Sequence, residues 1–333
     1  MLNNKTIIIT GGTGSFGKKF ISTILKKYKK IKKIIIFSRD ELKQFEMMKD
    51  YEKTKHHKIL RFFIGDIRDS ERLNMAFNDV DIVIHAAALK QVPTSEYNPF
   101  ETIKTNIIGT QNVVECCLKN NISKLISLST DKASSPINLY GATKLCSDKL
   151  VVSAENIKGK SKLVACVVRY GNVMGSRGSI VPLLIEKKND KTIELTHKEM
   201  TRFNISLDYA VEMVLLSMQK ASGGEIFVPK IPSYNLIDLA KAIMPKSKIK
   251  FVGIRPGEKL HEEMISFSES INSVIFDKYY VILPTSRDYK IKDYIKKNGG
   301  KEVTETFEYR SDTNKDFLSV KKIQNILRDY INY

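Results

Sequence analysis

The residue types best suited to catalysis lie together in LSTDKASSPINLYGATK, residues 128–144. Asp131 and Lys132 follow the apolar run LISLS, and charges at the end of a buried strand are costly unless a site uses them. Tyr140 and Lys144 are four residues apart, so on a helix they share one face. A lysine ammonium beside a phenol favours the phenolate, so Tyr140 can accept an alcohol proton near neutral pH, and Thr130 can hydrogen-bond the same hydroxyl. Taken alone, Asp131 and Lys132 could equally form a surface ion pair that contributes little energy.

The elements that must position these side chains alternate along the first two-thirds of the chain. Ile- and Val-rich runs, apolar along their length as in strands buried on both faces, predict strands at 5–10, 33–38, 58–65, 81–87, 124–129 and 162–169. Helices are predicted between them at 15–28, 40–50, 70–77, 98–119 and 137–157. Strands alternating with helices indicate parallel crossover units, so the predicted fold class is α/β, with a doubly wound parallel sheet of Rossmann type.

The turn after the first predicted strand reads GGTGSFG, residues 11–17, and opens the first helix. Its glycine spacing lets backbone amides approach a pyrophosphate at the positive end of that helix. A glycine motif can also be a mere tight turn, but its place in the first crossover unit favours dinucleotide binding. The candidate cofactor contacts in this turn are Gly11, Thr13, Gly14, Ser15, Phe16 and Gly17.

The end of the second predicted strand, FSRDELK, indicates which dinucleotide binds. An acidic residue there would hydrogen-bond the adenosine ribose hydroxyls of NAD. Ser38 and Arg39 come first instead, with Lys43 one turn further on, and Arg39 could pair with a 2′-phosphate. We therefore predict NADP, against the alternative that Arg39 is a solvated loop residue. Tyr140 and Lys144 are expected beside the nicotinamide and its ribose.

Two further strand ends complete the predicted cofactor site. Asp66 and Ile67 follow the third strand, where an adenine edge would lie. Ala86 and Ala87 follow the fourth strand, and their small side chains permit close approach of the cofactor. Lys90 could reach a phosphate, a ribose or the substrate, although an ordinary surface lysine is an equally good interpretation.

The alternation of strands and helices ends near Arg169, and we divide the chain there. Residues 1–170 are predicted to form the NADP-binding Rossmann domain, to which some later segments return. Residues 171–285 mainly form a smaller, mixed α/β substrate-binding cap, with a helix at 206–221, a strand at 225–230, a helix near 235–244 and a strand at 248–253. Residues 286–333 are a polar, Lys-rich C-terminal extension that we expect to pack loosely.

Composition limits the other classes of function. The 333 residues carry a formal net charge of +18, but the lysines are scattered and accompany no arginine-rich tract, so nucleic-acid binding is not expected. No apolar stretch approaches the length that crosses a bilayer, and the start MLNNKTIIITGG shows no signal peptide, so we expect a cytoplasmic protein without membrane association. The four cysteines lack metal-ligand spacing, which predicts reduced thiols and no metal site.

GGTGSFG, HAAALK and STDKASSPINLYGATK together resemble the extended short-chain dehydrogenase/reductase superfamily, in its nucleotide-sugar branch. Most sugar epimerases of that branch have no acid–base pair at the position of Asp131 and Lys132, and the retaining hexose 4,6-dehydratases have Asp-Glu there. Asp-Lys resembles the inverting UDP-N-acetylglucosamine 4,6-dehydratases of the pseudaminic acid type. Further similar stretches are RYGNVMGSRGSIVPLL (169–184), EMTRF (199–203), GGEIFVPKIPS (223–233) and GIRPGEKLHEEMI (253–265), so the resemblance covers about residues 5–285.

This resemblance implies a lyase that acts on UDP-N-acetylglucosamine with tightly bound, recycled NADP. Tyr140 would take the C4 hydroxyl proton while a hydride leaves C4. Lys132, as a neutral amine, would then remove the C5 proton, because burial and the cationic cofactor ring would both lower its pKa. Asp131, kept protonated, would donate to the C6 oxygen, which leaves as water.

The implied reaction ends when the hydride returns to C6 and a proton reaches C5 from the opposite face, with Tyr140 as a candidate donor. The product would be UDP-2-acetamido-2,6-dideoxy-β-L-arabino-hex-4-ulose. Formation of this ketosugar is the first step of pseudaminic acid biosynthesis, which serves flagellin glycosylation.

The resemblance also implies which side chains hold the UDP-sugar. Arg202 and Arg255 resemble diphosphate clamps, with paired donors suited to phosphate oxygens, and Glu258 could orient Arg255 or a ribose hydroxyl. The candidate substrate contacts are Lys90, Lys132, Asn172, Val173, Arg177, Arg202, Arg255 and Glu258. Asn204 departs from the large aromatic or aliphatic residue expected at its position.

Several alternatives stay open beside this interpretation. One is a related dehydratase, or a dehydratase with 5-epimerase activity, in a capsule or O-antigen aminosugar pathway. Another is a nucleotide-sugar 4-epimerase, and a third is a cofactor-sensing binding protein without catalysis, against which the intact catalytic set argues. The resemblance further implies a homo-oligomer, either a dimer formed through the helix of Tyr140 or a hexamer.

Overall fold

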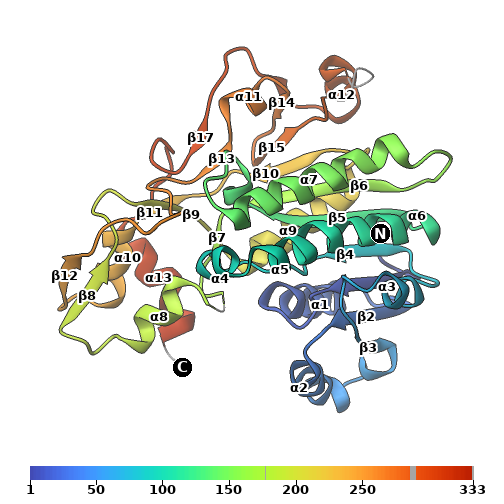
Figure 1. Ribbon diagram of the computed structural model, residues 1–333, viewed down its shortest axis with the longest axis horizontal. Coiled ribbons are helices and arrows are strands. Elements are labelled where there is room, and N and C mark those ends of the chain that lie inside the picture. The colour runs from blue at the N-terminus through green and yellow to red at the C-terminus, as the bar shows by residue number, and fades with distance from the viewer. Residues whose placement is uncertain (177, 286–289, 332–333) are drawn as a thin grey trace.

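A computed structural model describes residues 1–176, 178–285 and 290–331. Its largest unit is a ten-stranded sheet with the order β16-β14-β15-β10-β6-β5-β4-β1-β2-β3 (Figure 1). The seven strands from β3 to β10 in this order are parallel, and β15, β14 and β16 extend the sheet with antiparallel pairs. The sheet strands are β1 (Thr6–Thr10), β2 (Lys33–Ser38), β3 (Leu60–Ile64), β4 (Ile82–His85), β5 (Lys124–Thr130), β6 (Val164–Tyr170), β10 (Ile226–Pro229), β14 (Ser273–Ile275), β15 (Tyr279–Ile282) and β16 (Lys301–Glu302).

The central strands are apolar along their length because helices cover the sheet. Ile7, Ile8 and Ile9 of β1 are all fully buried. Helices α1 and α9 pack against each other, and α3, α6 and α7 form a second packed group. These and the short helices beside them are α1 (Ser15–Lys27), α2 (Glu41–Glu52), η1 (His57–Ile59), α3 (Ser70–Ala76), α4 (Val92–Tyr97), α5 (Pro99–Ile103), η2 (Lys104–Ile108), α6 (Gly109–Lys119), η3 (Asp131–Ala133), α7 (Leu139–Ile157) and α9 (Leu207–Lys220).

The strand order confirms the predicted doubly wound parallel sheet. The chain builds the sheet in one direction from β1 to β3 and in the other from β4 onward, so β1 and β4 flank the point where the order reverses. In open α/β sheets ligands bind outside the carboxyl ends of the strands at this point. The fold therefore places the glycine-rich turn after β1 and the small residues after β4 beside one crevice.

One helix differs from its predicted form. The segment expected as a single helix over 98–119 consists of α5, a π-helical turn η2 and α6. Asn106 in the π-helical turn is buried, and its side chain bonds both backbone groups of Leu89 and the hydroxyl of Thr143. The irregular turn thus brings an amide side chain to the loop after β4, which borders the crevice.

The cap forms its own small core beside the sheet, on the left of Figure 1. Its elements are β7 (Asn172–Val173), α8 (Ile180–Glu186), β8 (Thr192–Leu195), β9 (Thr201–Ile205), β11 (Ser233–Asn235), α10 (Leu236–Ile243) and β12 (Lys248–Phe251). The predicted strand at 225–230 is present as β10 but belongs to the main sheet, where it pairs with β6. The irregular sequence over 171–204 hid α8, β8 and β9, because these elements are short.

The C-terminal segment does not pack loosely, so that expectation was wrong. It contributes β16 to the main sheet, pairs β17 (Tyr309–Arg310) with β13 (Glu263–Ile265), and ends in α13 (Val320–Ile331), which packs on α10. Ile323 and Leu327 of α13 are fully buried in the cap core. The many lysines around them concealed one narrow apolar stripe, which is enough to bury a helix face. The remaining helices are α11 (Phe267–Ser270) and α12 (Ile291–Asn298).

The described ranges bear on two other kinds of function, membrane insertion and metal binding. None of the helices within them is long and apolar enough to cross a membrane. The same ranges contain no group of three or more His, Cys, Asp and Glu side chains that could hold a metal ion.

Candidate active site

A cavity of about 930 Å³ lies between the carboxyl ends of the parallel strands and the cap. It brings together nearly all of the side chains that the sequence singled out. The predicted residues that line it are Gly11, Thr13, Gly14, Ser15, Phe16, Gly17, Ser38, Arg39, Lys43, Asp66, Ile67, Ala86, Ala87, Lys90, Thr130, Lys132, Tyr140, Lys144, Asn172, Val173, Arg202, Arg255 and Glu258. Asp131 lies buried beneath the wall, and Arg177 lies outside the described residues.

The glycine-rich turn is packed too closely for larger residues. Gly11 has a φ of +69°, and a Cβ there would lie 2.9 Å from the backbone nitrogen of Ala87. A Cβ on Gly17 would lie 2.4 Å from the carbonyl oxygen of Gly12. Gly14 is the N-cap of α1 and has no side chain with which to cap the helix, and the first residues of α1 line the cavity. This is a cradle for a phosphate at a helix N-terminus.

The ends of β2 and β3 form a polar wall of the same cavity. Ser38 accepts a hydrogen bond from Thr13, whose hydroxyl lies 3.2 Å away. The Arg39 guanidinium is half exposed and lies 3.5 Å from the Asp66 carboxylate. Burial alone would raise the pKa of Asp66, but hydrogen bonds from Arg68 outweigh it and lower that pKa. Arg39 and Lys43 therefore line this edge of the cavity together with the carboxylates of Asp40 and Asp66.

Thr130, Asp131 and Lys132 sit where β5 ends in the short helix η3. The Thr130 hydroxyl donates to Asp131 Oδ1 over 3.0 Å and accepts from the backbone amide of Lys132 over 3.3 Å. Gly141 of α7 packs directly on this turn, since a Cβ there would lie 2.2 Å from the Lys132 carbonyl oxygen. The Thr130 hydroxyl thus fixes the turn from within, and α7 packs against the turn at Gly141, which has no side chain.

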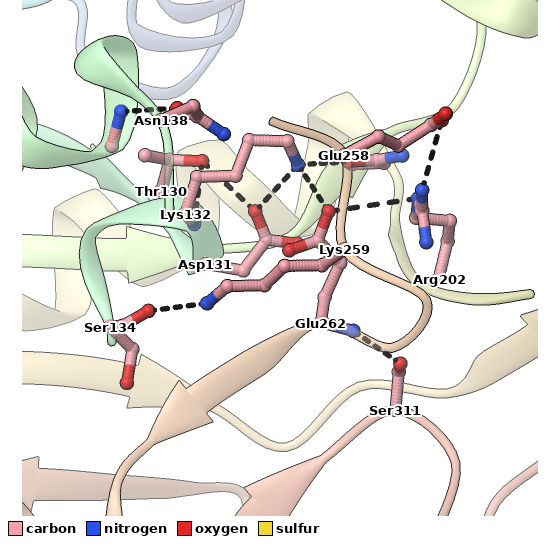
Figure 2. A network of polar contacts seen from close by, with 12 residues as sticks. Thr130, Asp131, Lys132, Ser134, Asn138, Arg202, Glu258, Lys259, Glu262 and Ser311 are labelled. Atoms are coloured by element: carbon pink, nitrogen blue, oxygen red, sulfur yellow. Dashed lines mark hydrogen bonds and ion pairs between the residues drawn. The ribbon is translucent and has the colours of Figure 1, made fainter. Parts of the chain in front are cut away.

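The Lys132 ammonium is surrounded by acceptors on three elements (Figure 2). Its Nζ atom lies 3.1 Å from Asp131 Oδ1, 2.8 Å from Glu262 Oε1 and 3.4 Å from Asn172 Oδ1. Glu262 was missed by the sequence reasoning, although it lies in the noted stretch RPGEKLHEEM. An acidic pair in a loop gives no periodic signal, so only its place in that stretch could have marked it.

Electrostatics in this cluster differ from the expectation for Lys132. Burial would lower the pKa of Lys132, but the carboxylates of Asp131 and Glu262 outweigh it, so that pKa is raised and the amine is charged. The expectation of a neutral amine considered burial and a cationic ring but not a second carboxylate. Burial raises the pKa of Asp131 even though Lys132 opposes the shift. Asp131 Oδ2 has no hydrogen-bond partner within the described part of the chain.

Tyr140 and Lys144 lie in the first turns of α7, which Asn138 caps by accepting a hydrogen bond from the Gly141 amide over 2.8 Å. Burial raises the pKa of Tyr140 to about 12, and the groups that chiefly oppose it are Lys132 and the Thr130 hydroxyl. The sequence had pointed to Lys144 for this role. Burial lowers the pKa of Lys144, and its Nζ lies 3.4 Å from the hydroxyl of Ser147.

The cap supplies the remaining cations of the cavity. Arg202 of β9 is buried, and its guanidinium lies 3.2 Å from Glu258 and 3.6 Å from Glu262. Arg255 is exposed at the cavity wall. Asn204, the departure noted in the sequence, is buried opposite Asn172 in the pairing of β7 with β9.

Comparison with known proteins supports a nucleotide-sugar enzyme fold. Residues 7–284 match the family model described as "Polysaccharide biosynthesis protein". The chain is 50% identical to the UDP-N-acetylglucosamine 4,6-dehydratase (inverting) of Campylobacter jejuni subsp. jejuni serotype O:23/36 (strain 81-176), with 98% of each chain covered. It is also 42% identical to the UDP-glucose 4-epimerase of Rickettsia bellii (strain OSU 85-389), with 99% of this chain and 98% of that one covered.

A solved structure extends the similarity to the whole fold. The X-ray structure of Pen from Bacillus thuringiensis superposes with a TM-score of 0.88 and 35% identity, covering 98% of this chain and 99% of that chain. The resemblance to inverting UDP-N-acetylglucosamine 4,6-dehydratases is thereby confirmed at the level of the sequence.

Proposed function

The chain belongs to the polysaccharide biosynthesis protein family, and we propose that it catalyses the inverting 4,6-dehydration of UDP-N-acetylglucosamine. The observation that carries this proposal is the Lys132 ammonium, bonded to Asp131 in the cavity that Tyr140 and the glycine-rich turn also line. An acid and a base side by side suit the removal of a proton from one carbon and a hydroxyl from the next. The product is UDP-2-acetamido-2,6-dideoxy-β-L-arabino-hex-4-ulose.

The cavity fits a nicotinamide dinucleotide. The close packing at Gly11 and Gly17 and the open N-terminus of α1 suit a pyrophosphate, and Arg39 with Lys43 suits a 2′-phosphate, so we favour NADP. Such a cofactor would accept a hydride from sugar carbon 4 and return it to carbon 6. The proposal of NADP predicts that Arg39→Ala weakens binding of NADP about tenfold while binding of NAD changes little, as measured by calorimetry.

Tyr140 is the group that we assign to the C4 hydroxyl. In its phenolate form it accepts the hydroxyl proton, and Lys132 and Thr130 both lower its pKa against the effect of burial. The buried Lys144 lies one turn further along α7 and serves to hold the cofactor ribose.

Lys132 and Asp131 can become base and acid through one internal proton transfer. Their atoms lie 3.1 Å apart, and moving a proton from the ammonium to the carboxylate leaves the charge of the pair unchanged. Because burial raises the pKa of Asp131, it favours the protonated carboxyl in this exchange. The neutral amine then removes the C5 proton, and the carboxylic acid protonates the C6 oxygen as it leaves. With the captured proton on Lys132 and the carboxyl proton lost to the leaving oxygen, the pair is again an ammonium beside a carboxylate, as in the resting site.

The UDP moiety is assigned to the cations at the cap side of the cavity. Arg202 and Arg255 offer paired donors for the diphosphate, and Glu258 already orients Arg202 at 3.2 Å. Asn172 and Val173 of β7 line the wall between this region and Lys132, where the hexose would lie. Lys90 lines the same cavity, and burial lowers its pKa.

A nucleotide-sugar 4-epimerase is the second candidate, since the Rickettsia bellii relative bears that name. A 4-epimerase changes neither C5 nor C6, so it has no use for a buried acid beside a lysine. Incubation with UDP-N-acetylglucosamine separates the two, because dehydration gives a product lighter by one water and epimerisation leaves the mass unchanged. In deuterated water, proton NMR should show label at C5 with inverted configuration, and Lys132→Ala should abolish the mass change while keeping the cofactor.

The same proposal extends to the pathway, the compartment and the oligomeric state of the protein. We place the reaction at the start of pseudaminic acid biosynthesis in the cytoplasm, in a homo-oligomer. A capsule or O-antigen pathway could use a related dehydratase that also epimerises C5. The configuration at C5 in the NMR experiment separates the inverted product from a product of such further epimerisation.

A further inference from the structure

Glu262 is a buried carboxylate that the proposed chemistry has not yet used. It is 1% exposed, lines the cavity, and precedes β13 in the loop that also carries Glu258. An ionised carboxylate at this depth is costly unless cations and hydrogen bonds compensate it. Its partners therefore indicate what it does.

The backbone of Glu262 is fixed by the C-terminal segment. Its amide donates to the Ser311 hydroxyl over 2.9 Å, and the Ser311 amide donates back to the Glu262 carbonyl over 2.8 Å. The Ser311 hydroxyl also lies 2.7 Å from that of Thr201, next to Arg202. These contacts fix the backbone of Glu262, whose side chain lines the cavity.

The carboxylate lies between two cations with distinct assigned roles (Figure 2). Oε1 is 2.8 Å from Lys132 Nζ and 3.6 Å from Arg202 Nε. Oε2 is buried and has no hydrogen-bond partner in the described ranges. Lys132 has the shorter contact, and Arg202 keeps a second carboxylate in Glu258, so the main partner of Glu262 is Lys132.

From this geometry we infer that Glu262 is a positioning residue for Lys132, which it holds against Asp131 and keeps charged until substrate binds. The catalytic meaning of this inference rests on the proposed dehydration, but the ion pair itself does not. Ion pairs with Glu262 at 2.8 Å and Asp131 at 3.1 Å hold the ammonium between the two carboxylates. The second carboxylate also sets how much neutral amine is present at a given pH.

Other charged or titratable groups face Lys132 and act in both directions. Asp131 raises the pKa of Lys132 as Glu262 does, whereas Arg202 lowers it. The further titratable groups coupled to this lysine are Tyr140 on α7, Tyr234 on β11 and Lys259 in the loop before β13. Glu262 has the closest contact, so Lys132 should register the loss of its charge even while Asp131 stays in place.

The test measures the amine directly, without turnover. Acetic anhydride acylates an amine only in its neutral form. Lys132 lines the cavity with 22% of its side chain exposed, so peptide mass spectrometry can follow its labelling rate. In Glu262→Gln the shape is kept and the charge is lost, and we expect labelling at about pH 9 to be at least tenfold faster than in wild type. Glu262→Asp keeps the charge, so its rate should stay nearer to wild type even if the contact lengthens. Glu263→Gln, the adjacent carboxylate that accepts from Ser134 and Ser135 at 2.7 Å, should leave the rate unchanged.

Turnover then tests the catalytic half of the inference. The acid limb of the pH profile of kcat should move to lower pH in Glu262→Gln, with a small change in KM, and should not move in Glu263→Gln. Equal labelling rates of Lys132 in Glu262→Gln and wild type would overturn the inference. Faster labelling with an unmoved pH profile would overturn its link to catalysis. If wild type leaves UDP-N-acetylglucosamine unchanged, the proposed function fails while the labelling result still decides the ion pair.

Discussion

Gly141 offers a sharp test of how the site is positioned, because an ordinary expectation about helices should fail there. Gly141 lies in the first turn of α7, where alanine normally stabilises a helix by about 1 kcal/mol relative to glycine. Here a Cβ would lie 2.2 Å from the Lys132 carbonyl oxygen and 3.1 Å from Pro136 Cβ. The nearest atom is backbone, so either α7 or the turn carrying Lys132 must move.

The expected size of the effect follows from that contact. Overpacking of a closely packed site costs about 1–3 kcal/mol, which outweighs the gain in helix propensity, so Gly141→Ala should lower the free energy of unfolding by up to about 2 kcal/mol. Relief of the clash needs a displacement of roughly 1 Å, and a shift of that size in a catalytic group can lower the rate about 100-fold. We therefore expect a large loss of kcat with cofactor binding retained.

The assay pairs the rate of water loss from UDP-N-acetylglucosamine with unfolding in urea. Gly159→Ala is the control, because its Cβ meets nothing within 4 Å but its φ of +53° disfavours alanine. That variant should lose about 1 kcal/mol of stability without a change in kcat, which separates instability from misplacement. A Gly141→Ala protein that is more stable than wild type and equally fast would refute the reasoning.

Three further outcomes can be checked by urea unfolding. Arg169→Met leaves the buried Asp148 carboxylate without its guanidinium 3.4 Å away and should cost about 3–5 kcal/mol, whereas a neutral result would mean that this buried pair is dispensable. Ile323→Ala should cost about 2–5 kcal/mol through a cavity in the cap core, and no loss would mean that α13 does not pack there. Burial alone would raise the pKa of Asp81, but a hydrogen bond from Lys5 and a backbone amide outweigh it and lower that pKa. Its stabilisation is thus present above the ordinary carboxyl pKa and lost as pH falls through the lowered one, so Asp81→Asn should destabilise the protein at pH 7. The difference from wild type should shrink as pH falls below the ordinary carboxyl pKa, and a constant difference would contradict this sign.

The fold was largely predictable because its signals are local. Each central strand is a short apolar run, and the turn at Gly11 needs its glycine for contacts within a few residues and the next strand end. Local signals failed where a short or polar element is stabilised by distant partners. Ile323 directly follows two lysines in the sequence, so its burial is not evident there. That burial depends on α10, about eighty residues earlier in the chain.

The sequence could indicate which residues line the candidate site, but not the charge state of Lys132. Tyr140 and Lys132 come from one continuous segment, so their spacing could be read from the sequence. The pKa of Lys132 depends also on Glu262, which is 130 positions away and is brought beside it by tertiary contacts of the loop before β13. A pattern within one segment cannot report a neighbour brought in by tertiary structure, and for that reason the ammonium form of Lys132 in the resting site was not expected.

The path of the C-terminal segment has a consequence for how the protein is made. Ser311 fixes the backbone of Glu262, and α13 completes the core of the cap, yet both follow every strand of the parallel sheet in the chain. The parallel sheet can form while synthesis continues, but the backbone of Glu262 cannot be fixed by Ser311 until that residue has emerged. The enzyme should therefore gain its ability to bind a dinucleotide before it gains a finished sugar pocket, and premature termination should leave a protein that retains only the first.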